Sequence, residues 1–354
     1  MQSDRPLRVL MLTSGDRTPS TRFRVLPFLQ HLHAARISAT VAESFPQKYD
    51  YFPWLGFRPS QKLKRCVRWA HWLYACVRRF DVIFVERELF DNDTVDLELR
   101  FRKLARRMVL DLDDAVFLRF PDKIDRLAKL ADTVIAGNSW IARWVIERNP
   151  NCVIIPTGVQ LANFPLRPPR DRSATPVIGW IGTIGNLGYL QVVAPALREL
   201  ARKTRFEFHV VVPEFTLPSN VDLTGVSCRH IVWNGSTELA SLHAFDIGIM
   251  PLFCDREWDR FKCPTKLIQY MAIGIPSVAT PVGFTGDVLQ SGIDGFYAAN
   301  DQQWQARLEI LLQDESLRNR MGAAAREKVA RDYCVESNWP LLAKAIEGDG
   351  SVST

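Results

Sequence analysis

The densest group of chemically useful residues lies between residues 251 and 283. Pro264 opens a helical pattern there, Lys262 precedes it, and Lys266 falls in its first turn. Cations are unfavourable at the amino end of a helix, where the helix dipole is positive. A bound phosphate would remove the conflict, because backbone N–H groups and two ammonium groups would converge on it. The alternative is a pair of solvated surface lysines; we expect the phosphate site.

A glycine-rich turn, residues 179–188, follows an apolar run and precedes a helical pattern. Gly182 and Thr183 in this turn would let the backbone approach a phosphate closely. The spacing differs from the G-x-G-x-x-G of dinucleotide sites, and no G-x-x-x-x-G-K-[ST] P-loop is found. The turn therefore predicts phosphate contact without an NAD site.

A third glycine-containing loop follows the first apolar run of the chain. Gly15 permits close backbone approach, and Arg22 and Arg24 lie at the start of the helical stretch that follows. These residues could bind an anionic part of a ligand at the helix terminus. The alternative is a solvated first turn.

Three carboxylates, Asp111, Asp113 and Asp114, directly follow the apolar run of residues 108–110. Their mutual repulsion needs a neighbouring arginine, a bound cation or a polar ligand. Capping of a short helix together with a salt bridge would also satisfy them. Asp-x-Asp can chelate magnesium, but no further ligand cluster accompanies it and the six His residues have no ligand spacing, so we expect no metal.

Apolar runs and helical stretches alternate along both halves of the chain, which predicts parallel sheets covered on both faces. The expected strands are residues 8–14, 37–42, 81–85, 108–112, 133–136, 152–156, 177–181, 206–212, 247–250 and 277–279. The expected helices are residues 21–35, 94–107, 138–148, 187–203, 236–244, 265–273, 304–312, 316–331 and 335–346. Ligands of such sheets bind beyond the carboxyl ends of the strands.

The 354 residues exceed what one compact core usually holds, so two domains are expected. A Pro-rich and charged linker covers residues 163–176. It separates an N-terminal Rossmann-like domain, residues 1–165, from a C-terminal one, residues 166–334. Residues 335–354 are expected to form a helix that packs back across the hinge, followed by a disordered tail. The site is expected in the crevice between the domains.

Positive charge is concentrated in the first half, where residues 1–172 hold 29 Lys and Arg against 19 Asp and Glu. Within it, residues 61–79 have a helical apolar stripe flanked by cations, with Trp69 and Trp72 at least partly exposed. The stripe either packs in the core or, with Trp54 and Phe57, helps bind an anionic membrane or an acidic acceptor. No nucleic-acid motif accompanies the charge. The sequence has no membrane-spanning segment and no secretion signal, so the chain is expected to be cytoplasmic. If the stripe binds an anionic membrane, the protein is expected to be peripheral at the inner face of that membrane.

The stretch 250–283 resembles the donor-binding region of retaining GT-B glycosyltransferases related to family 4. Its Met271-Ala-Ile-Gly-Ile-Pro-Ser-Val-Ala sequence is close to that family's pattern, as are Gly292-Ile-Asp-Gly and Val177-Ile-Gly-Trp-Ile-Gly-Thr. The resemblance implies a GT-B fold, with two Rossmann-like doubly wound domains facing across a cleft. It also implies a nucleotide-diphosphate sugar as co-substrate, with no metal and no other cofactor.

The chain departs from the family at the two glutamates of its usual donor motif, which align with Phe261 and Gln269. Asp255, Glu257 or Asp259 could replace the first glutamate. The catalytic candidates are Asp113, Asp114 and Lys266. The donor-binding candidates are Gly15, Gly182, Thr183, Glu257, Lys262, Thr265, Lys266, Leu267 and Gln269. The acceptor-binding candidates are Arg22, Arg24 and Asp111.

The function implied is that of a hexosyl or related transferase acting with retention on a glycan, lipid-linked or other acceptor, in cell-surface polysaccharide biosynthesis. In the family the departing phosphate can accept the acceptor's proton, so Asp113 or Asp114 would only position the acceptor hydroxyl. Two alternatives remain: a nucleotide-sugar isomerase of GT-B fold, and a catalytically inactive nucleotide-sugar-binding partner.

Overall fold

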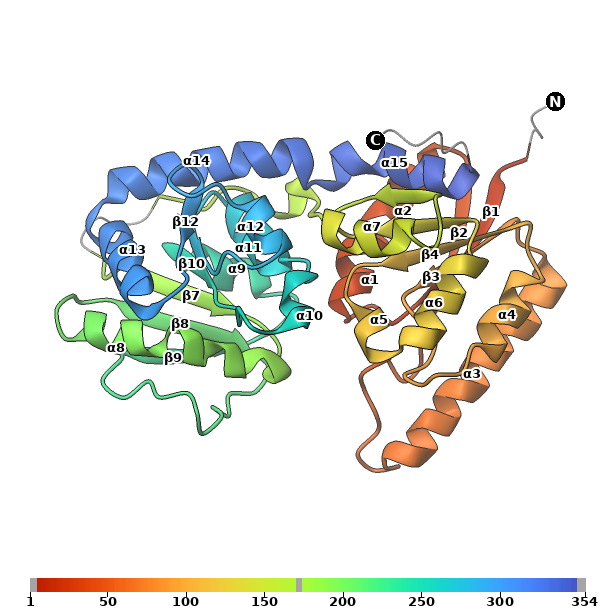
Figure 1. Cartoon of the computed structure of the whole chain (residues 1–354), viewed down its shortest axis with the longest axis horizontal. Coiled ribbons are helices and arrows are strands. Elements are labelled where there is room, and N and C mark those ends of the chain that lie inside the picture. The colour runs from red at the N-terminus through yellow and green to blue at the C-terminus, as the bar shows by residue number, and fades with distance from the viewer. Residues whose placement is uncertain (1–4, 170–173, 349–354) are drawn as a thin grey trace. The chain divides into compact units, whose positions relative to one another are not determined.

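The computed structural model describes residues 5–169 and 174–348, which divide into two compact units (Figure 1). Unit 1 runs to Gly158 and resumes at Val335, and unit 2 comprises Val159–Cys334. Part of the predicted linker, residues 170–173, lies outside the described residues, as does the end of the predicted disordered tail, residues 349–354.

The described part of unit 1 contains a parallel sheet of six strands in the order β2-β1-β3-β4-β5-β6. The strands are β1 (Leu7–Thr13), β2 (Ile37–Glu43), β3 (Val82–Glu86), β4 (Arg107–Leu112), β5 (Thr133–Ala136) and β6 (Cys152–Ile154). The helices are α1 (Pro19–Arg24), η1 (Leu26–Phe28), α2 (Leu29–Ala34), α3 (Phe57–Arg78), α4 (Asp96–Arg102), α5 (Val116–Arg119), α6 (Pro121–Leu130), α7 (Ser139–Ile146) and α15 (Val335–Glu347). β3 is buried along its whole length, as a strand covered on both faces must be.

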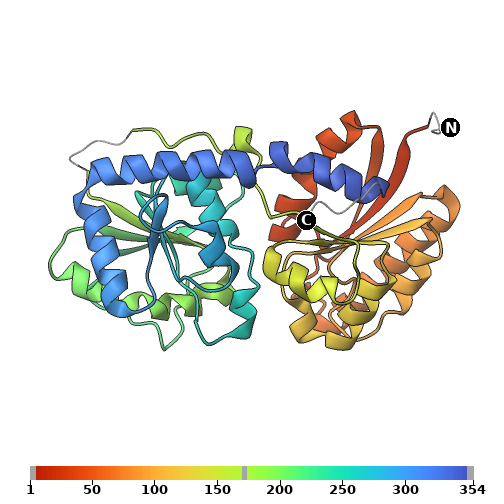
Figure 2. The ribbon, with the colours of Figure 1, turned by 45° about the horizontal axis from the view of Figure 1, so that its top comes forward.

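The described part of unit 2 contains a second six-stranded parallel sheet, in the order β12-β11-β10-β7-β8-β9. Its strands are β7 (Val177–Ile181), β8 (Glu207–Val212), β9 (Cys228–Val232), β10 (Ile247–Met250), β11 (Ser277–Ala279) and β12 (Gly295–Tyr297). Its helices are η2 (Leu161–Asn163), η3 (Ile184–Val192), α8 (Ala194–Ala201), α9 (Glu238–His243), α10 (Glu257–Arg260), α11 (Thr265–Ala272), α12 (Phe284–Val288), α13 (Asp301–Gln313) and α14 (Glu315–Asp332). Each sheet has helices on both faces (Figures 1 and 2), which confirms the predicted doubly wound α/β class.

The chain enters unit 2 earlier than the predicted boundary at residues 165/166. Val159 already forms a β-bridge with Cys334, and its N–H donates to the Tyr333 carbonyl at 3.0 Å. The last helix, α15, belongs to unit 1: it packs on α2, η1 and β5, and its Leu342 and Ile346 join the unit 1 core. Unit 1 is therefore built from both ends of the chain.

Two long predicted helices are interrupted in the structure. Residues 21–35 divide into α1, η1 and α2 around Pro27, and residues 187–203 divide into η3 and α8 around Pro195. Proline has no N–H to donate within a helix, which explains both breaks. The edge strands β9 and β12 were not predicted: no residue of β9 is fully buried, so its sequence is not an apolar run, and β12 has only three residues.

The long helix α3 presents the opposite face to the core from the one predicted. Its inward residues are Ser60, Lys64, Arg68 and Ala75. The predicted core stripe is instead largely outside, with Leu73 59% and Val77 81% exposed. The buried cations are accommodated because they donate to backbone carbonyls. Arg68 donates at the ends of two strands, to the Thr13 carbonyl at 2.5 Å and to the Ala42 carbonyl at 2.8 Å, and Lys64 donates to the Lys48 carbonyl, in the loop after β2, at 2.6 Å.

Candidate active site

The phosphate-binding candidates of unit 2 gather at one edge of its sheet. β7 and β10 are parallel neighbours, so the turn that follows β7 and the loop that follows β10 leave the sheet on the same side. The first carries Gly182 and Thr183, and the second leads through Lys262 to α11. The structure thus brings together segments about 80 residues apart.

Lys266 lies in the first turn of α11, with its Nζ 5.6 Å from the centre of the Trp180 ring. The first turn of α11 contains no acidic residue of its own. Gly182 packs closely on the same indole: a Cβ there would lie 2.2 Å from the Trp180 ring. Only glycine fits, so the turn after β7 stays close to Trp180.

Lys262 lies over a second aromatic ring of the same region, with its Nζ 4.5 Å from the centre of Tyr189. Lys262 of the β10–α11 connection and Lys266 of α11 therefore both lie at the β7–η3 segment. Thr265 starts α11, and the N–H groups of Lys266 and Leu267 belong to its first turn. The Leu267 side chain is fully buried, so only its backbone can contact a ligand.

Gln269, which the resemblance aligns with the second glutamate of the donor motif, is buried and donates from Nε2 to Glu238 Oε1 at 2.7 Å. Glu238, the first residue of α9, accepts a second bond on Oε2 from Trp233 Nε1, also at 2.7 Å. Glu238 of α9 therefore places a carboxylate beside Gln269. This contact was not expected from the sequence, because nothing in the spacing of residues 238 and 269 indicates it.

Gln269→Glu is expected to lower the free energy of unfolding by about 2 kcal/mol or more at neutral pH. The change removes a hydrogen bond to a charged group and places two buried carboxylates together. Urea unfolding measures the loss. Gln302→Glu, the same change at an exposed position of α13, is the control and should stay within about 0.5 kcal/mol. An equally small effect at Gln269 would contradict the contact.

The three candidate replacements for the missing first glutamate lie in different surroundings. Asp259 is fully buried and accepts bonds from the Tyr189 hydroxyl and the Phe253 N–H, so both of its oxygens are used inside the protein. Asp255 and Glu257 are exposed, the latter as the first residue of α10. Asp255 and Glu257 therefore remain the candidates for contact with a sugar.

At the carboxyl edge of the unit 1 sheet, Arg24 and Asp111 form a bidentate ion pair, with Nε 2.8 Å from Oδ2. Their side chains are 4% and 1% exposed, and Arg24 also donates to the Ile155 carbonyl at 2.9 Å. Burial raises the pKa of Asp111, although Arg24 opposes the rise. We assign this pair to holding α1 on the sheet rather than to the acceptor contact expected from the sequence.

Asp113 and Asp114 share Arg87, a residue that the sequence analysis missed. The Arg87 guanidinium forms two bonds to Asp113, one of them 2.8 Å long, lies 3.5 Å from Asp114, and donates to the Tyr49 hydroxyl at 3.0 Å. Arg87 has φ 58°, the left-handed region that non-glycine residues rarely adopt. Burial alone would raise the pKa of Asp113, but pairing with Arg87 lowers it below the ordinary value.

The Asp113 carboxylate is expected to stabilise the fold in a pH-dependent way. A lowered pKa adds stability above the ordinary value of about 3.9, and this stability is lost as the pH falls through the folded-state pKa. Asp113→Asn should therefore cost about 1–3 kcal/mol at pH 7, and the difference from wild type should shrink towards about pH 3. Urea unfolding across this range checks it; a constant difference would show that charge pairing is not the cause.

The remaining candidates of unit 1 lie beside this edge. Gly15 has φ +124°, and a Cβ there would lie 2.7 Å from the Gln47 side chain, so the loop after β1 requires glycine. Arg22 is half-buried over the Phe23 ring. Glu86, at the end of β3, accepts from the Ser20 and Thr21 hydroxyls at 2.6 Å each and fastens α1 to the sheet.

Within residues 5–169 and 174–348, no group of three or more His, Cys, Asp or Glu is arranged to hold a metal ion. A search of the same residues for a helix with the length and apolar character of a membrane span finds none.

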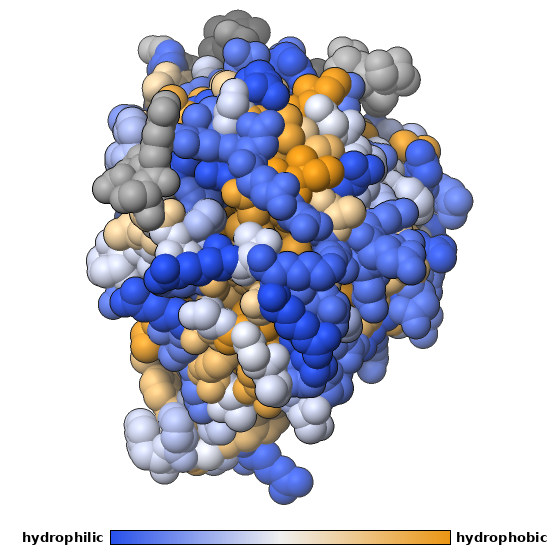
Figure 3. Space-filling model, turned by 90° about the vertical axis from the view of Figure 1, so that its left-hand side faces the viewer, coloured by the Kyte–Doolittle hydropathy of each residue, from blue (hydrophilic) through white to orange (hydrophobic). Residues whose placement is uncertain are grey.

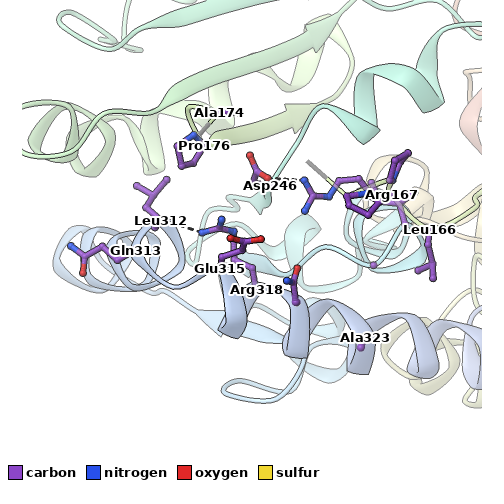
Figure 4. Close-up of a pocket in the computed structure, with 15 residues that line it drawn as sticks. Leu166, Arg167, Ala174, Pro176, Asp246, Leu312, Gln313, Glu315, Arg318 and Ala323 are labelled. Carbon is purple, nitrogen blue, oxygen red and sulfur yellow. Dashed lines mark hydrogen bonds and ion pairs between the residues drawn. The ribbon is translucent and has the colours of Figure 1, made fainter. Parts of the chain in front are cut away.

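A cavity of about 540 Å³ in unit 2 lies away from the candidate residues (Figure 4). Pro176 and Asp246, which line it, directly precede β7 and β10, so it lies at the amino ends of these strands. Its charged groups are already engaged: Arg167 pairs with Asp246 at 2.7 Å, and Arg318 donates to the Leu312 carbonyl at 3.1 Å.

Figure 3 shows a face of unit 2 on which apolar side chains reach the surface between hydrophilic ones, an ordinary pattern for protein surfaces.

The candidate phosphate site falls in a stretch with a known family match. Residues 175–314 match the family model of glycosyl transferases group 1. The matched stretch contains β7 to β12, both lysines and Gln269. None of the curated protein sequences compared with the chain matches it.

Solved structures resemble the whole chain. A glycosyltransferase from Rickettsia africae has a TM-score of 0.71 at 13% identity, covering 98% of this chain and 100% of that one. Sucrose-phosphate synthase from Thermosynechococcus elongatus has a TM-score of 0.71 at 14% identity, covering 96% and 98%. HepE from Anabaena, in complex with UDP and glucose, has a TM-score of 0.65 at 13% identity, covering 97% and 100%. These likenesses confirm the predicted GT-B fold.

Proposed function

We propose that the protein is a glycosyltransferase that moves a sugar from a nucleotide-diphosphate donor to an acceptor hydroxyl, with retention at the anomeric carbon. The main support is the placement of Lys262 and Lys266 at the start of α11, beside the turn after β7. The family match of residues 175–314 and the UDP bound by the similarly folded HepE add to it.

In this reaction the bond between the anomeric carbon and the β-phosphate oxygen breaks, and the acceptor oxygen bonds to that carbon on the same face. The acceptor's proton passes to the departing phosphate. The leaving diphosphate gains negative charge, and preorganised ammonium and N–H groups stabilise it most in the transition state. Lys266 is the principal catalytic candidate, and Asp113 and Asp114 are proposed to orient the acceptor hydroxyl.

Calorimetry with UDP, GDP and ADP, followed by incubation with the corresponding sugar donors, tests the proposal. We expect one nucleoside diphosphate to bind with micromolar affinity and its sugar donor to release it slowly in water. Binding without release, with or without acceptors, would favour the inactive nucleotide-sugar-binding partner. Conversion of the sugar without nucleotide release would favour the isomerase, and failure of all three nucleotides to bind would refute donor binding.

We further propose that α3 attaches unit 1 to an anionic membrane surface, such as the inner face of the membrane, where a lipid-linked acceptor would lie. Trp69, Leu73 and Val77 form an outward apolar stripe on α3, and Trp54 precedes the helix at 80% exposure. Exposed cations on the same helix, including Lys62 and several arginines, complement anionic lipid headgroups.

Co-sedimentation with vesicles of phosphatidylcholine, with and without phosphatidylglycerol, tests this attachment. Binding is expected only with the anionic lipid, and the pair of changes Leu73→Glu and Val77→Glu should abolish it. Because both side chains point outward, the variant should fold normally. Equal sedimentation of variant and wild type would refute a role for the stripe.

A further inference from the structure

Tyr189 connects the two segments that form the candidate phosphate site. It lies in η3, a segment that contains neither Lys nor Arg, and its side chain is largely buried. Its ring packs on Phe253 at a centroid distance of 5.0 Å, and Phe253 belongs to the loop between β10 and α11. The hydroxyl donates to Asp259 Oδ1 at 2.5 Å. Tyr189 therefore joins η3 to the loop that carries Lys262.

Asp259 holds this loop together from inside. It is fully buried, and its second oxygen accepts the Phe253 N–H at 3.1 Å. A buried carboxylate is stable only when it is hydrogen-bonded, so both contacts matter to the loop's conformation. Of the two groups that donate to Asp259, the Tyr189 hydroxyl is a side chain and the Phe253 N–H is backbone. Burial raises the pKa of Tyr189, and the hydrogen bond to the Asp259 carboxylate raises it further. The hydroxyl therefore keeps its proton and can donate it to that carboxylate.

The same hydroxyl also contacts Lys262. Its oxygen lies 3.4 Å from Lys262 Nζ, and the ammonium group lies 4.5 Å from the centre of the ring. Since the hydroxyl proton is directed to Asp259, the oxygen can accept from the ammonium group. The ring adds a cation–π attraction. Tyr189 thus restricts the side chain of Lys262, which has many rotamers available.

We propose that Tyr189 is a positioning residue, which together with Asp259 holds the Lys262 ammonium group ready to bind the diphosphate of a nucleoside diphosphate. The inference rests on the proposed donor site. It explains how η3, which lacks cations, acquires one from a neighbouring loop. The ligand class that this arrangement selects is the diphosphate, rather than the monophosphate, because a second, prepositioned cation is useful only where a second phosphate is present.

A double-mutant cycle between Tyr189→Phe and Lys262→Met tests the proposal. Calorimetry measures the affinity of each variant for two ligands. These are the nucleoside diphosphate that binds most tightly among UDP, GDP and ADP, and the corresponding monophosphate. Tyr189→Phe should weaken diphosphate binding by about three- to tenfold and leave monophosphate binding nearly unchanged. In the Lys262→Met background, Tyr189→Phe should have little further effect. Tyr189→Leu, which also removes the ring, should cost more than Tyr189→Phe.

The control is Tyr74→Phe, the same change on an exposed ring of α3 in unit 1, and it should leave affinity unchanged. Circular dichroism verifies folding, and Tyr189→Phe, which keeps the ring, suffices if Tyr189→Leu does not fold. Unchanged diphosphate affinity in Tyr189→Phe, equal losses for both nucleotides, or additive effects of the two changes would overturn the inference while leaving the donor site intact. A wild-type chain that binds no nucleoside diphosphate would overturn the proposed function itself.

Discussion

Replacing Lys266 with alanine is expected to weaken binding of the preferred nucleoside diphosphate by about ten- to a hundredfold, the equivalent of one hydrogen bond between charged groups. Lys266 lies in the first turn of α11, where the positive end of the helix dipole and the ammonium group would both attract a diphosphate. Calorimetry on the wild type and the variant measures the loss. Turnover of the sugar donor should fall at least as far, because the diphosphate is most negative as it departs.

The matched control is Lys203→Ala, which removes an exposed lysine just after α8 and before β8, at the amino end of that strand. Its effect on affinity should be less than about twofold at moderate salt. Comparable losses in both variants would mean that general charge attraction is being measured. Unchanged affinity in Lys266→Ala would show that the phosphate site lies elsewhere.

Replacing Lys123 with methionine is expected to cost about 3–5 kcal/mol of unfolding free energy, the largest stability effect predicted for the chain. Its ammonium group lies 3.0 Å from Glu98 Oε1 and 3.0 Å from the Phe90 carbonyl, and both charged side chains are fully buried. The change keeps the apolar stem but leaves the Glu98 carboxylate buried without its partner charge. Urea unfolding at neutral pH measures the cost.

The same helix provides the control. Lys129 pairs with Asp125 at 2.7 Å, but its side chain is 59% exposed, so Lys129→Met should change stability by no more than about 0.5 kcal/mol. Adding Glu98→Leu to Lys123→Met should recover much of the loss, because no unpaired charge then remains. If the double variant is as unstable as the single one, altered packing rather than the unpaired charge is responsible.

The layer structure could be predicted from the sequence because each buried strand is a short apolar run bounded by polar residues. The orientation of α3 could not. Its apolar positions follow helical spacing, which normally indicates a core face. The face that is actually buried depends on the Thr13 and Ala42 carbonyls, which need donors and receive them from Arg68. Those acceptors lie more than 25 residues away in the sequence, so local periodicity could not reveal them.

The candidate site was partly predictable for the same reason. Lys262 and Lys266 stand out because their position relative to Pro264 conflicts with helix electrostatics, a local signal. Tyr189, Glu238 and Arg87 became candidates only through contacts made by the fold. Of these, Arg87 had a usable signal, since it lies between two acidic residues directly after a buried strand.

The return of the chain to unit 1 at Val335 has a consequence during synthesis. Unit 2 is one continuous segment, whereas the core of unit 1 is complete only after α15 has been synthesised. While unit 2 is being translated, Val9, Phe28 and their neighbours in the unit 1 core lack the cover that α15 later supplies. During this interval the N-terminal part of unit 1 has been synthesised but its core is incomplete. Chaperones that bind exposed apolar surface would therefore act on unit 1.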